Sequence, residues 1–278
     1  MGFSWFESIL YGLISGLTDI LPVSAQAHKL ILQKMLGINY EPILMRLFIH
    51  AAVFAALYFS CTPIIIKITR ARRLARIPKK HRKRPLDTKS LMDFRLLRTM
   101  MLPIILAFFC YEKASSLQSS LVLVACIVFV NGLALYIPQF LPGSNKDSRM
   151  LSRVEGLLMG LGGALSVIPG FSGIGMALSV GSVCGVDRNY GLSVALLMNL
   201  AILIGQIVFD IMDIISGGIG LFDLSILMNY ILAACAAFCG TTGGIRIMRH
   251  MAAEKGFTVF AYYCWGAALF TFALNLLA

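Results

Sequence analysis

Gly12-Leu-Ile-Ser-Gly-Leu-Thr-Asp-Ile-Leu-Pro-Val-Ser-Ala-Gln-Ala-His28 is a short stretch in which an apolar helical run stops at Pro22 and a polar turn follows. The polar side chains are Asp19, Ser24, Gln26 and His28. Polar groups that break a helix at membrane depth are tolerated only where they line a cavity or are buried in protein. The stretch is therefore a candidate functional site.

The second half of the chain repeats this pattern. Gly156-Leu-Leu-Met-Gly-Leu161 has the same spacing as Gly12 to Leu17, and Ile168-Pro-Gly-Phe-Ser172 follows it as Leu21-Pro-Val-Ser24 follows the first motif. The two Gly-Leu motifs begin about half the chain apart. This spacing predicts two copies of one structural unit.

Composition excludes a soluble domain. The chain is 58% hydrophobic and 13% charged, with a mean hydropathy of +0.83, as in integral membrane proteins. Its start has no basic region and no small-residue cleavage site, so we expect no removable signal peptide. The seven cysteines are scattered through apolar runs without a Cys-x-x-Cys pair, which indicates packing residues.

The net charge of +11 is confined to one segment. Between Lys67 and Arg98 stand 13 Lys and Arg residues against Asp87 and Asp93, so the rest of the chain sums to zero. A basic loop between apolar helices marks the cytoplasmic side of a membrane and can contact anionic lipid headgroups. It lacks the aromatic residues and recognisable fold of a nucleic-acid-binding domain. We expect residues 67–95 to be a cytoplasmic loop.

Apolar runs of about 17 to 25 residues are long enough to span a bilayer. Five runs are long enough, and a sixth, Leu96 to Tyr111, is a shorter candidate that its flanks could extend. Two further segments, Phe3 to Leu36 and Val154 to Gly185, are predicted to be pairs of short helices broken near Pro22 and Pro169. The expected spans are Ile43 to Ile66, Leu96 to Tyr111, Leu117 to Leu141, Leu192 to Ser216, Leu221 to Ile247 and Phe257 to Leu277.

Placing the basic loop in the cytoplasm puts every other basic cluster there too and turns both termini outward. The first broken hairpin then enters from the outside and the second from the inside. We therefore expect an all-α polytopic protein with a single membrane domain over residues 1–278. It is built of two inverted-topology repeats, 1–141 and 154–278, each a re-entrant helical hairpin followed by three transmembrane helices.

The chain carries two motif regions. The first is Gly16-Leu-Thr-Asp-Ile-Leu-Pro-Val-Ser24 with His28, and the second is Pro169-Gly-Phe-Ser172 with Gly185-x-x-Arg188. They resemble the two signature regions of the undecaprenyl-pyrophosphate phosphatase (bacitracin-resistance) family. The resemblance covers the whole chain. It implies a multi-pass protein of the bacterial plasma membrane that hydrolyses undecaprenyl diphosphate to undecaprenyl phosphate, recycling the lipid carrier for peptidoglycan synthesis. It also allows for a homodimer, and for a divalent cation, Mg or Ca, as cofactor.

By the same resemblance, the catalytic residues are Asp19, Ser24 and His28, and the phosphate is bound by Gly170 and Ser172. Phosphoryl transfer needs positive charge over the phosphate oxygens and a nucleophile or base in line with the bond that breaks. Each of these residues also has a structural interpretation. Asp19 could cap the broken helix, His28 could be a buried core histidine, and the serines and glycines could let the hairpins turn and pack.

The chain departs from the family pattern at three positions. Ser15 stands in the place of a glutamate, Ala25 in that of a serine and Gly173 in that of an arginine. These losses favour a second function, in which the protein binds or flips the polyprenyl phosphate without hydrolysing it.

A diphosphate in a cavity of low dielectric constant needs a cation beside it. Arg46 is the best candidate, because it lies near the outer end of a span at a position where the family tends to carry an acid. Lys29 and Arg188 are the alternatives. We therefore count Arg46 among the expected phosphate-binding residues.

Overall fold

The computed structural model describes residues 3–38, 40–82, 85–143, 145–217, 224–254 and 256–277. In these ranges the regular elements are helices, apart from one β-bridge between Lys146 and Val186. The α-helices are α1 (Trp5–Ile20), α2 (Ala25–Leu36), α3 (Ile43–Ala75), α4 (Thr88–Phe108), α5 (Tyr111–Ser115), α6 (Leu121–Tyr136), α7 (Arg153–Ala164), α8 (Gly173–Val183), α9 (Arg188–Gly217), α10 (Leu224–Glu254) and α11 (Val259–Leu277). Short 3-10 turns are η1 (Lys79–His81), η2 (Ser116–Ser119), η3 (Ile137–Phe140) and η4 (Leu165–Val167).

Five of the described helices, α3, α6 with η3, α9, α10 and α11, are long and apolar enough to cross a membrane. A sixth span is possible if α4 and the α5–η2 segment, bent by 68° from one another, count as one. This confirms the expected all-α membrane protein. Helix α3 continues nine residues past the expected end at Ile66, because its basic last turns are helical although they are not apolar. The expected start of α10 at Leu221 lies outside the described residues.

Two helical hairpins, α1–α2 and α7–α8, complete the fold. The first helix of each hairpin begins with the same capping box, formed by Ser4 with Glu7 and by Ser152 with Glu155. The serine side chain accepts a hydrogen bond from the backbone N–H of the glutamate, and the glutamate side chain accepts one from the backbone N–H of the serine. The longest of the four helices has 16 residues, or about 24 Å at 1.5 Å per residue. None of them reaches across a hydrocarbon core of about 30 Å.

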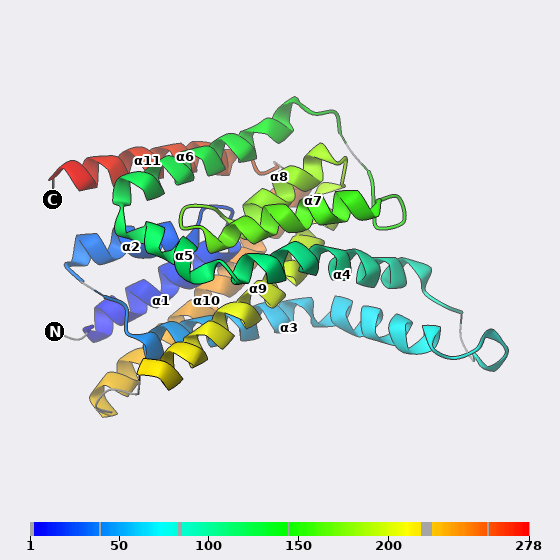
Figure 1. Cartoon of the computed structure of the whole chain (residues 1–278), viewed down its shortest axis with the longest axis horizontal. Coiled ribbons are helices and arrows are strands. Elements are labelled where there is room, and N and C mark those ends of the chain that lie inside the picture. The colour runs from blue at the N-terminus through cyan, green and yellow to red at the C-terminus, as the bar shows by residue number, and fades with distance from the viewer. Residues whose placement is uncertain are drawn as a thin grey trace.

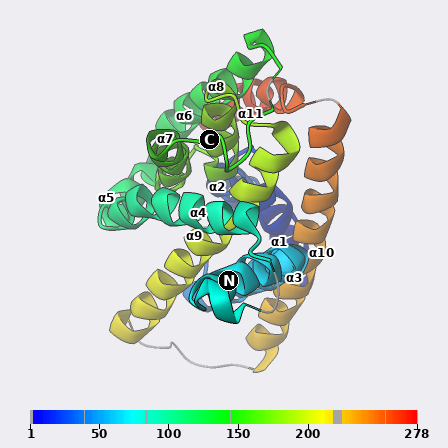
Figure 2. The same ribbon diagram turned by 90° about the vertical axis from the view of Figure 1, so that its right-hand side faces the viewer.

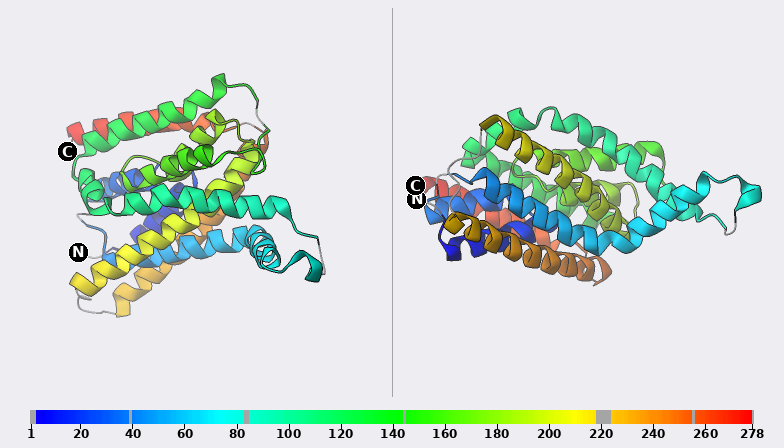
Figure 3. Two further views of the ribbon diagram at one scale, coloured as in Figure 1. Left: turned by 45° about the vertical axis from the view of Figure 1, so that its right-hand side comes forward. Right: turned by 90° about the horizontal axis from the view of Figure 1, so that it is seen from below.

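The helices run roughly parallel to the longest axis of the molecule (Figure 1). Both termini lie at one end, and the basic segment after α3 projects beyond the helices at the other end (Figure 3). The α1–α2 hairpin opens toward the end with the termini and the α7–α8 hairpin toward the opposite end (Figure 1). The turns of both hairpins therefore lie in the middle of the molecule.

Glycines let each hairpin pack closely on a long helix. A Cβ on Gly12 or Gly16 would lie 2.0 or 2.1 Å from the carbonyl oxygen of Ala233 or Ala237, so α1 lies directly against the backbone of α10 (Figure 2). In the same way a Cβ on Gly160 of α7 would lie 2.4 Å from the Met100 carbonyl oxygen of α4. Small residues at this spacing allow close helix packing in membranes.

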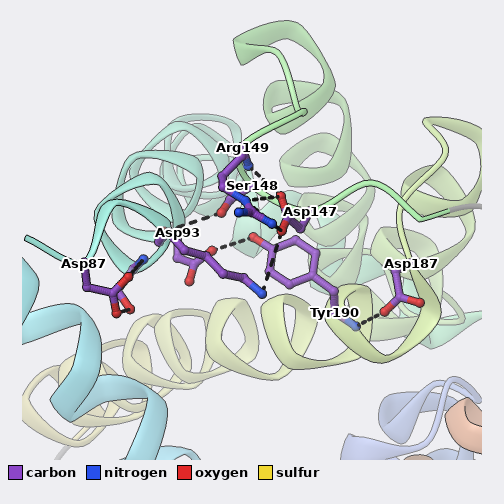
Figure 4. A network of polar contacts seen from close by, with 9 residues as sticks. Asp87, Asp93, Asp147, Ser148, Arg149, Asp187 and Tyr190 are labelled. Atoms are coloured by element: carbon purple, nitrogen blue, oxygen red, sulfur yellow. Dashed lines mark hydrogen bonds and ion pairs between the residues drawn. The ribbon is translucent and has the colours of Figure 1, made fainter.

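The end that carries the basic segment is tied together by a polar network (Figure 4). The Tyr190 hydroxyl of α9 donates to Asp93 Oδ1 of α4 over 2.8 Å, and Lys89 Nζ lies 5.6 Å from the centre of the Tyr190 ring. In the segment before α7, the hydrogen bond from the Arg149 guanidinium lowers the pKa of Asp147. The network therefore fixes the start of α9 against α4.

Tyr190→Phe is expected to lower the free energy of unfolding by about 2 kcal/mol, because it removes a hydrogen bond to a carboxylate and leaves Asp93 without that donor. Thermal unfolding in detergent measures the effect. Tyr58→Phe, at a half-exposed tyrosine of α3 far from the network, is the matched control. Equal melting temperatures for the two variants would contradict a stabilising role for the Tyr190–Asp93 bond.

Candidate functional site

The turns of the two hairpins touch at the centre of the molecule. The backbone N–H of Gly170 donates to Ser24 Oγ over 3.2 Å, and Ser172 Oγ donates to the Leu21 carbonyl over 3.3 Å. Asn131 of α6, which is fully buried, joins both turns: its Nδ2 donates to the Pro22 carbonyl over 3.0 Å and its Oδ1 accepts from Ser172 N over 2.9 Å. The structure thus brings Ser24, Gly170 and Ser172 together.

The side chains of Ser24 and Ser172 already make hydrogen bonds within this contact. Ser24 is the N-cap of α2 and has a left-handed φ of 62°, and its Oγ accepts from the N–H groups of Ala27 and Gly170. Ser172 is the N-cap of α8, and its Oγ accepts from Gly175 N. The observed bonds hold the two turns in place.

His28 is also close to this contact, and both of its ring nitrogens have partners. Nδ1 lies 2.8 Å from the Ser24 carbonyl, which can only accept, so Nδ1 carries the proton. Nε2 then accepts from the Tyr263 hydroxyl over 2.9 Å, and the two rings are stacked with centroids 5.5 Å apart. His28 faces α11 and is absent from the lining of the cavity described next.

A polar cavity of about 440 Å³ opens beside the first hairpin, at the end of the molecule that carries the termini. It is lined by α1, α2, the start of α3, the α5–η2 segment and the end of α9. Asp19 and Arg46 both line it, as do the three substituted or neighbouring motif positions Ser15, Ala25 and Gln26. Two of the six predicted site residues therefore share one cavity.

A narrow cleft continues from this cavity to the second hairpin. Asp19, Ala25, Gln26 and Gln206 line both spaces, and Ser172 and Gly173 line the cleft. A Cβ on Gly173 would lie 2.8 Å from Ser166 Cβ and 3.1 Å from the Gly163 carbonyl oxygen, so the packing has no room there for a longer side chain. The arginine of the family pattern has no space at this position.

Several buried polar atoms around Asp19 lack a partner. Asp19 Oδ2 accepts from Asn199 Nδ2 over 3.1 Å. Ser15 Oγ, Gln26 Oε1 and Gln206 Oε1 are buried without a hydrogen bond within the described part of the chain. Unsatisfied buried polar atoms cost about 1 to 3 kcal/mol each, so they indicate a place for water or a polar ligand.

Arg46 is held by two carboxylates of α9. Its Nε donates to Asp210 Oδ1 and its Nη2 to Asp213 Oδ2, both over 2.6 Å. Asp210 is buried and its other oxygen contacts His50 Nδ1, also at 2.6 Å, whereas Asp213 is half exposed. Lys29 lies 3.2 Å from Glu41 in the same cavity, so both cations are paired with acids.

His50, Asp210 and Asp213 lie outside the motifs from which the candidate site was predicted. Asp210 is buried and central to the ion pairs. The signal was present in the spacing: Arg46 and His50 are four residues apart on α3, and the aspartates are three apart on α9, so each pair lies on one helix face. Ionisable residues on one face of a membrane span are functional candidates.

Comparison with known proteins points to one family along nearly the whole chain. The family described as "Bacitracin resistance protein BacA" matches residues 8–270. The chain is 26% identical over 274 residues to the undecaprenyl-diphosphatase of Methanobrevibacter smithii, covering 96% of each chain, and 28% identical over 261 residues to that of Halothermothrix orenii, covering 94% of each. A Nocardioides undecaprenyl-diphosphatase is 29% identical over 213 residues, 77% of each chain.

Proposed function

The chain belongs to the bacitracin resistance protein BacA family, and we propose that it hydrolyses undecaprenyl diphosphate to undecaprenyl phosphate and inorganic phosphate. The site is assigned to the cavity around Asp19, because the cavity has Arg46 in its wall and buried polar atoms without a partner in the described structure. Relatives named undecaprenyl-diphosphatase along nearly their whole length support hydrolysis. They do not favour the alternative of a non-hydrolytic binder or flippase.

In this proposal the terminal phosphate occupies the cavity and the polyprenyl chain leaves it toward the lipid. Asp19, held by Asn199, orients the attacking water beside the phosphorus. Arg46 supplies positive charge to the phosphate oxygens, because its Nη1 makes no hydrogen bond within the described residues while Nε and Nη2 are held by carboxylates. Fixed donors and charges of this kind lower the barrier to phosphoryl transfer.

The remaining predicted site residues receive a positioning role. Ser24, Gly170 and Ser172 join the hairpin turns, and His28 bonds to Ser24 and Tyr263. Their predicted direct contact with the substrate stays a prediction. The partnerless Ser15, Gln26 and Gln206 are better placed to bond to the phosphate or its water.

A divalent cation stays a proposal. The described residues hold no group of three or more His, Cys, Asp or Glu side chains that could bind a metal, so they do not form a resident metal site, and no step here depends on one. Acids nevertheless outnumber cations around the cavity, with Asp19, Glu41, Glu112 and Asp213 against Lys29 and Arg46. A Mg²⁺ or Ca²⁺ ion that arrives bound to the diphosphate would neutralise most of the charge of the diphosphate and so reduce its repulsion from these acids.

We also propose that the fold is an inverted repeat with two re-entrant hairpins. The N-caps of the first hairpin helices, Ser4 and Ser152, and those of the second, Ser24 and Ser172, are both 148 residues apart. The packing is reciprocal, since α1 of the first repeat lies on α10 of the second and α7 of the second on α4 of the first. The two hairpins open toward opposite ends (Figure 1).

The positive-inside rule then places the basic segment in the cytoplasm and the cavity near the outer face of the bacterial plasma membrane. The limits of the two repeats, 1–141 and 154–278, and the homodimer stay predictions.

Phosphate release from undecaprenyl diphosphate by purified protein, with and without EDTA, tests the proposed function. Asp19→Asn is expected to lower the turnover rate by at least about a hundredfold, because the group that orients the water loses its charge. Asp147→Asn, which removes a carboxylate at the opposite end, is the control. If wild-type protein binds the lipid but releases no phosphate with Mg²⁺ or Ca²⁺ present, hydrolysis is excluded.

A further inference from the structure

His50 is a buried histidine that the family resemblance does not account for. Its side chain is 10% exposed and lines the same cavity as Asp19. It lies in α3 one turn after Arg46, on a helix that packs against α9. An ionisable side chain at this depth in a membrane span is costly unless it has a partner or a role.

Its partner fixes which ring nitrogen carries the proton. Nδ1 lies 2.6 Å from Asp210 Oδ2, and a carboxylate accepts, so Nδ1 donates. Asp210 is 1% exposed, and its other oxygen is held by Arg46. The aspartate therefore cannot turn away, and the lone pair of the neutral ring is on Nε2, which makes no hydrogen bond within the described residues.

This arrangement differs from that of His28. Both nitrogens of His28 are bonded, to Ser24 and to Tyr263, and its ring faces α11. His50 lines the cavity, and of its two ring nitrogens only Nδ1 is bonded within the described part of the chain. A carboxylate that orients a histidine in this way also stabilises the imidazolium formed when the ring takes a proton.

We propose that His50 is the general base of the hydrolysis, with Asp210 as its positioning residue. This proposal rests on the proposed function. A water molecule attacks the terminal phosphorus and gives its proton to Nε2 of His50. The bond between that phosphorus and the bridging oxygen breaks, and the bridging oxygen leaves with undecaprenyl phosphate. The imidazolium then releases its proton to solvent, which restores the neutral ring.

The proposal accounts for a site that lacks the family's usual charges. Ser15 and Gly173 stand where the motif has a carboxylate and an arginine. Helix α3 instead brings Arg46 and His50 to the same cavity, and Asp210 of α9 bonds to both of them. The cation and the base thus come from long helices and not from the hairpins. The other charged groups in the cavity wall are Asp19, Lys29, Glu41, Glu112 and Asp213.

The first test compares kcat and KM for phosphate release by wild-type, His50→Gln and His81→Gln proteins. His81 is an exposed histidine of η1 in the basic segment, so its substitution is the matched control. His50→Gln is expected to lower kcat by about 10²- to 10⁴-fold with little change in KM. A wild-type kcat in His50→Gln would overturn the proposal. If His28→Gln loses turnover while His50→Gln keeps it, the base is His28 and not His50.

Imidazole supplies a measurement that a folding defect does not imitate. In His50→Ala, added imidazole is expected to restore part of kcat, because it can occupy the vacated space in the cavity and accept the proton. A folded His50→Ala protein that is inactive and not rescued would overturn the assignment. So would a labelled terminal phosphate trapped on the protein, since that result makes a side chain the nucleophile.

Asp210 is tested by a pair of substitutions. Asp210→Asn and Asp213→Asn each remove one carboxylate from Arg46, but only the first touches His50. Asp210→Asn is expected to lose more kcat, and the double variant His50→Gln/Asp210→Asn to lose no more than His50→Gln alone. Additive losses would overturn the positioning role. Absence of phosphate release by the wild-type protein is a different result, because it rejects the proposed function itself.

Discussion

Arg46→Ala is expected to weaken the binding of undecaprenyl phosphate by about 10- to 100-fold. A hydrogen bond between charged groups contributes about 1.5 to 3 kcal/mol, and 1.4 kcal/mol corresponds to a factor of ten. Lys29, the other cation in the cavity wall, is paired with Glu41 and does not replace it. Binding of the labelled lipid to purified protein in detergent measures the loss.

The same substitution also affects stability, so a second variant separates the two effects. Arg46→Ala leaves the buried Asp210 with His50 as its remaining partner in the described structure, and breaking a buried ion pair costs about 3 to 5 kcal/mol. Arg46→Ala/Asp210→Asn removes the unpaired charge and is expected to recover much of the stability but none of the binding. Wild-type affinity in either variant would remove Arg46 from the phosphate site.

The membrane spans were predicted well because the signal for them is local. A run of about 20 apolar residues specifies a span by its own transfer free energy, whatever it packs against. The cytoplasmic position of the basic segment stays a prediction. Helix α3 ends nine residues beyond the predicted end of its span at Ile66. Hydropathy reports where a helix leaves the apolar layer and not where its backbone hydrogen bonding stops.

The repeat was predicted from two matches, and the Gly-Leu match lies one helical turn out of the register that the N-caps give. Gly12 and Gly156 begin the Gly-Leu motifs, but the N-caps place Gly12 opposite Gly160, and both of these glycines pack on a carbonyl of a neighbouring helix. Short apolar motifs recur along a helix at intervals of one turn, so they indicate a repeat but not its register. Each helix has only one N-cap, so a pair of matching caps also indicates the register of the proposed repeat.

Half of the candidate site could not be predicted from the motifs. Asp19 is in the motif and lines the cavity. His50 and Asp210, 160 residues apart, meet only because α3 and α9 pack together. The spacing of ionisable residues marks one face of α3 and one face of α9 as candidates, but it does not reveal that these two faces meet, because their pairing is a tertiary contact that no local pattern specifies.

Gly16→Val is expected to be strongly damaging to the packing of the first hairpin. A Cβ at this position would lie 2.1 Å from the Ala237 carbonyl oxygen and 2.7 Å from its carbonyl carbon. These are backbone atoms of α10, so no side-chain rotation relieves the overlap and the two helices must separate. Overpacking of a well-packed interior typically costs about 1 to 3 kcal/mol, and a clash with backbone belongs at or above the upper end.

Gly243→Val is the matched control, because it puts the same side chain on α10 itself at a position where an added Cβ meets no atom within 4 Å. We expect Gly16→Val to lower the melting temperature sharply and to reduce the yield of monodisperse protein, while Gly243→Val behaves like the wild type. Since Asp19 lies one turn beyond Gly16 on α1, any Gly16→Val protein that folds should also lose turnover, because a shift of about 1 Å in a catalytic group can cost a hundredfold in rate. Full stability and activity in Gly16→Val would mean that α1 can move away from α10 without disturbing the cavity. That result would contradict our inference that the close packing of these helices holds Asp19 in position.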